Sequence, residues 1–564
     1  MAKILDTFQD KQDAGVAISR RAAFALAGIL ALALVLRLWG IGFGLPYAYH
    51  IDEPTYTSAA LNLGAGIVGR QPNPTGFSNA LFAEYAAFYL VNRVAGVFHS
   101  TADFELAYRS DISIFLLLGR LTTVGMGVLN VLAVYWLGRR MHGPLAGLLA
   151  SAFLAVAFLH VRDSHYSVPD VAATCLVTLC VLLCALAVGE DHRRYYNLAA
   201  AVGGLAIATK WSIWQVAIPL ALAALYGWRA RRKATTAGRW GTLVLMGLCF
   251  LGGFLLGGFQ LLWQPATFVN YALRELTAGE GGGFGDWQID TVPGWLFYAK
   301  TLLYGLGVVL LALAVVGWLR RLIQTIRTRD KVGVLVLAFP VFYFAFMGAT
   351  RHYFARYALP LTPFMALFAA DAVVALFAFL RMKRAALGWG VVALLTVAAV
   401  IEPLAESIRH DLLLTRQDTR TLAKAWVEAN LPAGARIATD WPGHTPPLST
   451  SERPMPNSAR VYDVLAVGGT GLADHPIEWY REQNFDYLIA SSYIYNIPLV
   501  SPEQDARRRA FYAALDQELA LVQEFRPYAG DQEPRFIFDE IYGPAINLWQ
   551  RDRPGPTLKI YKVQ

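Results

Sequence analysis

The sequence predicts an all-α polytopic membrane protein that is joined to a smaller soluble α/β domain at its C-terminal end. Two observations predict this class. The chain is 56% hydrophobic and only 16% charged, whereas an ordinary soluble domain is about 25% charged. The apolar residues also come in blocks of roughly twenty, which is the length with which a helix crosses a bilayer. We therefore divide the chain into a membrane domain, residues 1–401, and a C-terminal domain, residues 402–564.

Eleven apolar blocks predict about eleven transmembrane helices. The first block follows Arg20 and Arg21, and no small-residue cleavage site comes after it, so we expect a retained helix and not a signal peptide. All four cysteines lie inside such blocks, which argues against a disulfide framework. The blocks are residues 22–38, 114–137, 145–159, 171–188, 198–208, 213–228, 243–262, 295–319, 332–348, 359–380 and 387–401.

The charges of the connections predict the topology. The C-terminal domain carries 17 Lys and Arg against 22 Asp and Glu, which leaves 32 basic and 19 acidic residues for the membrane domain. The basic residues gather in every second connection, and positive connections stay in the cytoplasm. We therefore expect the N-terminus inside, the C-terminal domain outside, and a plasma or inner membrane protein without a nucleic-acid partner. The basic connections are residues 139–140, 193–194, 229–239, 320–331 and 381–384.

The first outer connection, residues 40–111, is too long for a simple loop. Its semi-apolar stretch, residues 77–98, is interrupted by Glu84, Asn92 and Arg93, and it predicts one or more helices that lie at the membrane interface. A re-entrant span is the alternative, which the alternation of charge disfavours.

The C-terminal domain mixes helix and strand signals. Residues 419–430 have helical periodicity, and residues 436–439 begin a strand after a Pro-Ala-Gly turn. Residues 485–490 alternate as a strand does, and residues 507–525 predict an amphipathic helix.

Two adjacent carboxylates follow the first apolar block, in residues 49–56 with the sequence YHIDEPTY. A carboxylate at the mouth of a membrane helix, here Asp52 or Glu53, suits a general base or a cation ligand. The alternative is a helix cap, with Asp52 at the start of the next helix. His50 and Tyr56 are further candidates for the same site.

A second polar segment, residues 160–170 with the sequence HVRDSHYSVPD, joins two apolar blocks. Its Asp170 opens a helix directly after Pro169, which also suits a simple helix start. His160, His165 and Asp170 are metal-ligand types, although their spacing matches no closed site. If a divalent metal is bound, we expect its ligands among Asp52, Glu53, His165 and Asp170.

Basic residues stand at the outer ends of two later blocks, against the topology rule. They are Lys210, Arg351 and Arg356, the last followed by Tyr357. Fixed cations at this level suit an anionic headgroup such as a phosphate, which arginine holds with two hydrogen bonds. Contact with ordinary anionic lipids is the alternative.

Taken in this order, these segments resemble the membrane glycosyltransferases that use a polyprenyl-phosphate sugar, a group that includes the protein O-mannosyltransferases and the lipid A aminoarabinose transferase and whose fold is called GT-C. The resemblance covers about residues 20–380. It rests on the acidic motif of residues 50–56 and the interfacial helices after it. It also rests on residues 119–140 (Gly-Arg to a basic turn), 164–170 (Ser-His…Pro-Asp), 203–211 (Gly-rich, ending Thr-Lys-Trp) and 356–363 (Arg-Tyr…Pro…Pro).

The resemblance implies an enzyme that transfers a sugar from a lipid phosphate to an acceptor hydroxyl outside the membrane, with inversion. Asp52 would act as the base, and Glu53 and Asp170 would orient the acceptor, assist the base or bind a metal. Lys210, Arg351 and Arg356 would hold the donor phosphate. The acceptor is a protein, a lipid or a glycan, and no nucleotide is needed. A transporter or flippase of lipid-linked sugars is the alternative, against which the chain shows no inverted repeat.

Overall fold

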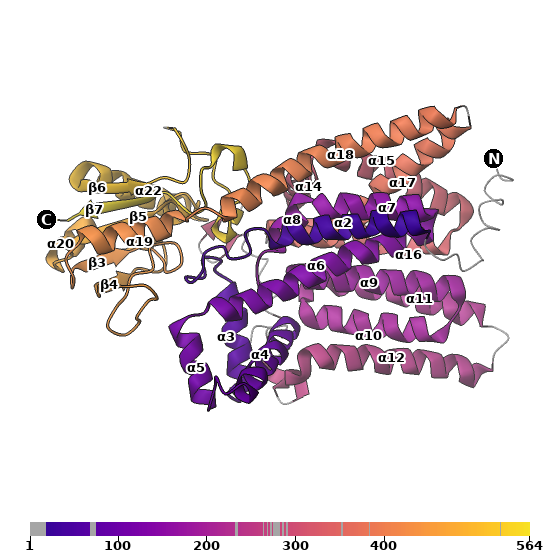
Figure 1. Ribbon diagram of the computed structural model, residues 1–564, viewed down its shortest axis with the longest axis horizontal. Helices are drawn as coiled ribbons and strands as arrows, with labels where there is room; N and C mark the ends of the chain where they lie inside the picture. The colour runs from indigo at the N-terminus through magenta and orange to yellow at the C-terminus, as the bar shows by residue number, and fades with distance from the viewer. Residues whose placement is uncertain are drawn as a thin grey trace.

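We describe the fold from a computed structural model of the chain (Figure 1). A bundle of long helices forms one body, and a mixed sheet with its own helices forms a second body that packs against one end of the bundle. We call this end of the bundle the domain-facing end. The structure describes residues 19–67, 75–231, 235–262, 264–267, 269–270, 273, 283–284, 287–288, 292–350, 353–382, 384–530 and 532–563.

Apolar helices build the bundle, as the composition predicts. Ser19 caps the first of them by accepting a hydrogen bond from the backbone N–H of Ala22 (3.3 Å). The helices are α2 (Arg20–Leu38), α6 (Ser113–His142), α7 (Pro144–Val156), α8 (Phe158–Asp163), α9 (Pro169–Glu190), α10 (Arg193–Thr209), α11 (Ala217–Ala230), α12 (Thr236–Gly258), α14 (Gly294–Leu306), α15 (Val308–Thr328), α16 (Lys331–Ala349), α17 (Thr362–Arg381) and α18 (Ala385–Leu414), with the 3-10 helices η1 (Trp211–Val216), η2 (Phe259–Leu262) and η4 (Ala355–Leu361).

The predicted apolar blocks all fall on helices of the bundle. Within the described ranges, eight helices are long and apolar enough to cross a membrane, and α7 is a shorter apolar helix. The prediction of one continuous helix over residues 295–319 was wrong. Gly307 lies between α14 and α15 with φ at +77°, a backbone conformation that side chains disfavour and that ends the first helix.

Glycines explain how the short, glycine-rich block of residues 198–208 is packed. A Cβ atom on Gly204 would lie 2.0 Å from the carbonyl oxygen of Phe250, and one on Gly253 would lie 1.9 Å from that of Ala201. The absence of these side chains lets α10 and α12 approach backbone to backbone, as small residues do between membrane helices.

Three helices fill the long connection after α2: α3 (Glu53–Gly64), α4 (Gly76–Val94) and α5 (Thr101–Ser110). The predicted helix of residues 77–98 is thus present as α4. Its start is fixed to the end of α12, because Thr75 and Asn79 both donate to the carbonyl oxygen of Gly257 (2.9 Å each). The three helices lie together beside the domain-facing end of the bundle (Figure 1).

The C-terminal domain contains a five-stranded mixed sheet in the order β4-β3-β5-β7-β6. Strands β4, β3 and β5 are parallel, and β7 is antiparallel to both β5 and β6. The predicted helix 419–430 and strand 436–439 are confirmed. The strands are β3 (Arg436–Thr439), β4 (Asp463–Ala466), β5 (Tyr487–Ser491), β6 (Ala520–Phe525) and β7 (Leu558–Lys562), and the helices are α19 (Thr419–Asn430), η5 (Gly471–Asp474), α20 (Ile477–Glu482), α21 (Ser492–Tyr495), α22 (Pro502–Glu518), η6 (Phe538–Tyr542) and η7 (Leu548–Gln550).

The predicted amphipathic helix over residues 507–525 was wrong in its last third. Helix α22 ends at Glu518, Leu519 is extended (φ −117°, ψ 151°), and the chain continues as β6. Strand β6 pairs with β7, which comes more than thirty residues later in the chain. Helical periodicity reflects local sequence only, so this pairing was not visible in it.

The bundle continues into the C-terminal domain through one helix. Helix α18 runs to Leu414, so the predicted boundary at residue 402 falls inside it. Contacts between this helix and the end of the domain hold the two bodies together: Arg409 donates to the carbonyl oxygen of Leu548 (3.1 Å), and the indole N–H of Trp549 donates to Glu406 (2.7 Å).

Candidate active site

Two of the predicted carboxylates stand at helix starts. Asp52 directly precedes α3, and Asp170 is the second residue of α9. Each helix has a proline in its first turn, where the missing N–H leaves no hydrogen bond unmade. The helix N-terminus carries a partial positive charge, which favours an ionised carboxylate at this position.

Each carboxylate pairs with a predicted cation from a distant segment. Arg356 donates to Asp52 over 2.8 Å, and Lys210 donates to Asp170. The Asp170 side chain is only 4% exposed, whereas that of Asp52 is 31% exposed. Of the two carboxylates, Asp52 is therefore the more accessible to solvent.

The two ion pairs belong to one cluster. The Lys210 ammonium lies 4.5 Å from the centre of the Tyr357 ring, next in the chain to Arg356. Burial raises the pKa of Tyr56, and the charges of Asp52 and Asp170 both raise it further. The structure thus brings six predicted residues together, which we call the active-site cluster: Asp52, Tyr56, Asp170, Lys210, Arg356 and Tyr357. Arg351, another predicted phosphate-binding residue, lies outside the described residues.

Glu53 faces away from this cluster. Its side chain is fully buried, and Arg120 donates to both of its oxygens (2.8 and 2.7 Å). The backbone N–H of Ser167 donates to the same carboxylate (2.8 Å), and Arg120 also donates to the carbonyl oxygens of Ile41 and Phe43. Glu53 therefore fixes the start of α3, and with it the neighbouring Asp52, against α6.

His50 forms part of the wall behind Asp52. Its Nδ1 accepts a hydrogen bond from the backbone N–H of Asp52 (3.3 Å). Its ring centre lies 4.5 Å from that of Tyr166 and 5.5 Å from that of Tyr542. Burial lowers the pKa of His50, as do the charges of nearby arginines, so this ring is neutral and positions the loop.

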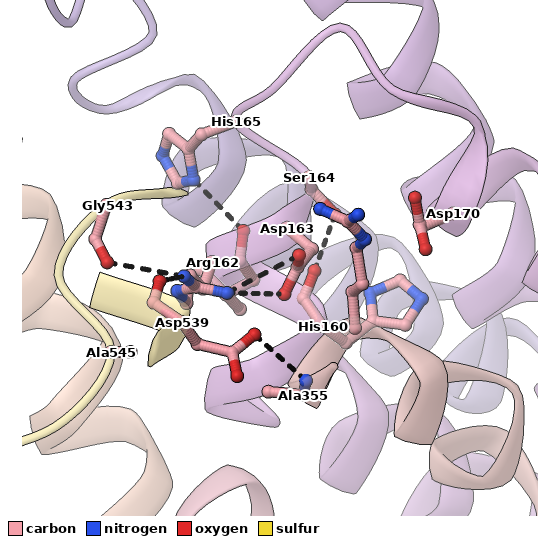
Figure 2. Close-up of polar contacts among 12 residues, drawn as sticks. His160, Arg162, Asp163, Ser164, His165, Asp170, Ala355, Asp539, Gly543 and Ala545 are labelled. Atoms are coloured by element: carbon pink, nitrogen blue, oxygen red, sulfur yellow. Dashed lines mark hydrogen bonds and ion pairs between the residues drawn. The ribbon is translucent and has the colours of Figure 1, made fainter. Parts of the chain in front are cut away.

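His165 does not face the active-site cluster. Its Nδ1 lies 2.9 Å from the carbonyl oxygen of Val161 and its Nε2 lies 3.0 Å from that of Trp39. Figure 2 shows the His165 and Asp170 side chains well apart. Within the described ranges, three metal-ligand side chains gather at one place, where His165 joins His410 and Asp411 and not Asp52, Glu53 or Asp170.

A segment of the C-terminal domain completes the site, and the sequence analysis missed it. Arg162 of α8 donates to the carbonyl oxygens of Asp539 (3.0 Å), Gly543 (3.2 Å) and Pro544 (3.0 Å), as Figure 2 shows in part. We call residues 538–545 the insert segment. The carboxylate of Asp539 in turn accepts from the backbone N–H of Ala355 (2.9 Å).

The insert segment places an aromatic ring against the partly exposed Asp52–Arg356 ion pair. The Tyr542 ring centre lies 4.3 Å from the guanidinium carbon of Arg356, and Phe354 lies 4.7 Å from it on another side. Both the acidic and the aromatic residues of this segment are visible in the sequence, but its contact with α8 spans more than 370 residues. No local pattern marks a contact of that range.

Comparison with known proteins agrees with this architecture. Residues 116–256 match the family model described as dolichyl-phosphate-mannose-protein mannosyltransferase. The oligosaccharyltransferase of Archaeoglobus fulgidus in its apo form superimposes with a TM-score of 0.54 at 13% identity, over 84% of this chain and 70% of that one. ArnT from Cupriavidus metallidurans in the apo state gives 0.48 at 13% identity, over 89% and 97%. No curated protein sequence matches the chain.

These findings define the class of the protein. The fold is similar to that of the archaeal oligosaccharyltransferase, which is a GT-C fold glycosyltransferase. Together with the family match, which covers residues 116–256 from α6 to α12, this fold indicates a membrane glycosyltransferase that is similar to the mannosyltransferases.

Proposed function

We propose that the protein transfers a sugar from a polyprenyl-phosphate carrier to the hydroxyl group of an acceptor. The observation that carries the proposal is the partly exposed Asp52–Arg356 pair beside the more deeply buried Asp170–Lys210 pair. A base and a phosphate-binding cation are thereby adjacent. The matched family is named for a dolichyl-phosphate sugar donor, which supports a donor of this chemical class.

The cations of the active-site cluster are suited to hold the donor phosphate. Arg356 offers a planar guanidinium for two hydrogen bonds, and Lys210 adds a compact charge. Both lie at the starts of segments that lead into the bundle, Arg356 in η4 before α17 and Lys210 between α10 and η1. The isoprenoid tail would extend from there along the apolar helices. Arg351 stays a further candidate for the same phosphate.

Binding of the phosphate would release the base. Asp52 and the donor phosphate compete for Arg356, so a bound donor frees the carboxylate. Asp52 then accepts the proton of the acceptor hydroxyl while its oxygen attacks the anomeric carbon. The bond from that carbon to the phosphate oxygen breaks, and the lipid phosphate leaves with the electron pair. Attack from the side opposite the leaving group inverts the anomeric carbon.

The other carboxylates support this step. Asp170 holds Lys210 in place, and Glu53 holds the start of α3 through Arg120. Preorganised charges of this kind stabilise the charge that develops on the leaving phosphate. The acceptor, whether protein, lipid or glycan, would approach between the first connection and the insert segment.

The reaction would take place on the extracytoplasmic side. The predicted inner connections are basic, and a separate ion-pair group joins the end of α6 to α15 and to the middle of α17. His142 lies 2.5 Å and Arg320 2.7 Å from Asp371 in this group. Since α6 is thirty residues long, this group lies far along the bundle from the domain-facing end.

The direct test uses the purified chain in lipid nanodiscs with a panel of polyprenyl-phosphate sugars. Release of sugar from one donor, with an acceptor product of inverted anomeric configuration, is the expected result. A retained configuration would contradict the single in-line step. Translocation of intact donor with no release from any member of the panel would favour the transporter interpretation.

A further inference from the structure

Two histidines and a carboxylate form a second polar cluster outside the active-site cluster. His410 and Asp411 lie on α18, and His165 lies in the loop between α8 and α9. The three side chains are 0% exposed, and one nitrogen or oxygen atom of each lies within 4.8 Å of the others. These are metal-ligand types brought together from a loop and a helix that are distant in the sequence.

Two distances in this cluster match the edges of a tetrahedral metal site. One oxygen of Asp411 lies 3.4 Å from Nε2 of His165 and 3.2 Å from Nδ1 of His410. Zinc bonds to nitrogen and oxygen are about 2.0–2.1 Å long, so two ligands of a tetrahedral ion are about 3.3 Å apart. The carbonyl oxygen of Trp39, 3.0 Å from the same His165 nitrogen, provides a fourth donor.

The hydrogen-bond partners of His165 favour a bound cation at this position. Its Nδ1 lies 2.9 Å from the carbonyl oxygen of Val161, where it can only donate. In the neutral ring, Nε2 then carries a lone pair and faces two oxygen atoms, those of Trp39 and Asp411. Such an arrangement is repulsive unless a metal ion or a proton lies between Nε2 and the Asp411 oxygen. A histidine that binds a metal commonly donates its other N–H to a backbone carbonyl in this way.

The remaining atoms of the cluster lack partners. Among the described residues, the second oxygen of Asp411 and Nε2 of His410 make no hydrogen bond. The positive charge of Arg37 acts on Asp411. The Arg37 guanidinium, however, donates its hydrogen bonds to the carbonyl oxygens of Ala33 and Ala155 and contacts His160. The carboxyl of Asp411 has one hydrogen-bond partner, Nδ1 of His410 (3.2 Å), which compensates its burial only in part, and a metal ion bound to the cluster would offset more of that cost.

We propose that His165, His410 and Asp411, with the Trp39 carbonyl, bind one divalent transition metal ion. Two imidazoles and one carboxylate form a donor set that favours zinc among the common ions. The ion would join the C-terminal end of α2, the loop that leads to Asp170 and the helix that continues into the C-terminal domain. Its role is to fix these three segments together, and it takes no part in sugar transfer.

Metal content provides the test, and it does not depend on activity. The detergent-purified full chain is stripped with a chelator, loaded with Zn²⁺ or Co²⁺, desalted and analysed by mass spectrometry for metal. We expect one ion per wild-type chain, loss of the ion in Asp411→Asn and His410→Gln, and retention in His475→Asn, a matched change in the C-terminal domain. No retained ion in the wild type, or equal content in all variants, would overturn the proposal.

A second variant distinguishes loss of the metal ion through removal of a ligand from loss through misfolding. His410→Cys keeps a ligand at the same position, so it should retain Co²⁺ and add a thiolate-to-cobalt absorption band that the wild type lacks. A Co²⁺-loaded His410→Cys chain without this band would place the ion elsewhere and overturn the assignment.

Discussion

The Asp52 carboxylate accepts a hydrogen bond from Arg356 over 2.8 Å, although 304 residues separate the two in the chain. The pair joins the first connection of the bundle to the start of α17. It is more exposed than the Asp170–Lys210 pair beside it, and one ring of the C-terminal domain covers it. A donor phosphate that reaches Arg356 would meet the proposed base at the same place.

Substitution of Arg356 tests the phosphate site. Arg356→Lys keeps the charge but loses the two-pronged geometry, and charge-assisted hydrogen bonds contribute about 1.5–3 kcal/mol each. We expect the KM for the donor to rise about tenfold or more, with a larger rise for Arg356→Ala. The exposed Arg109 on α5 provides the control, because Arg109→Ala should leave donor KM unchanged. An unchanged donor KM in both Arg356 variants would remove this residue from the phosphate site.

Tyr542 tests whether the C-terminal domain contributes to the site. The ring lies 4.3 Å from the Arg356 guanidinium, and cation–π contacts of this kind contribute about 0.5–2 kcal/mol. Tyr542→Phe keeps the ring and should leave the donor KM near the wild-type value, whereas Tyr542→Leu should raise it about fivefold. An equal rise of the donor KM in both variants would show that the hydroxyl group or simple packing is responsible, and not the contact with Arg356.

Glu53 should be essential for stability. Removal of one partner from a buried ion pair costs about 3–5 kcal/mol, because the other charge stays buried without compensation. Glu53→Gln should therefore lower the thermal midpoint of the detergent-purified protein markedly. Glu105→Gln breaks the exposed pair with Arg109 and should cost less than about 1 kcal/mol. Equal midpoints for the two variants would contradict the assigned role.

Asp440 should make the stability of the C-terminal domain depend on pH. Burial raises its pKa to about 6, although Leu472, Ser491 and Tyr512 donate hydrogen bonds to it. A raised folded-state pKa means that the folded chain binds the proton more tightly than the unfolded chain. Its stabilising contribution is thus complete below about pH 4 and is lost as the pH rises through about 6.

Unfolding of the C-terminal domain in urea, with limited proteolysis as the readout, measures this contribution. Relative to the wild type, Asp440→Asn should show a smaller loss of stability between pH 4.5 and pH 7. The same pH dependence in both proteins would assign the effect to other groups.

The sequence predicted the helices better than their contacts. Hydrophobic blocks located the bundle, because a spanning helix is defined by its own composition. Asp52, Asp170, Lys210 and Arg356 were predicted one by one, since a polar residue beside an apolar block is conspicuous. Their pairing was not predicted, because each pair joins segments that are distant in the chain. The same reason hid the bond from Arg162 to the insert segment and the pairing of β6 with β7.

The different roles of Asp52 and Glu53 within the acidic motif also could not be predicted from the sequence. Asp52 and Glu53 are adjacent and chemically alike, yet Asp52 is partly exposed beside Arg356 and Glu53 is buried against Arg120. The difference comes from the position of each residue at the start of α3, where successive side chains point in different directions. Burial and partners, and not residue type, separate the proposed base from the residue that positions it.

The most direct test of the proposed mechanism is sugar release by Asp52→Asn in nanodiscs, measured beside Glu105→Gln, a change of an exposed carboxylate in the same connection. A general base contributes typically about 10²–10⁴-fold to turnover. We predict a loss of that size in Asp52→Asn, with folding and donor binding retained and with normal turnover in the control. Wild-type turnover in Asp52→Asn would contradict the assignment of Asp52 as the base.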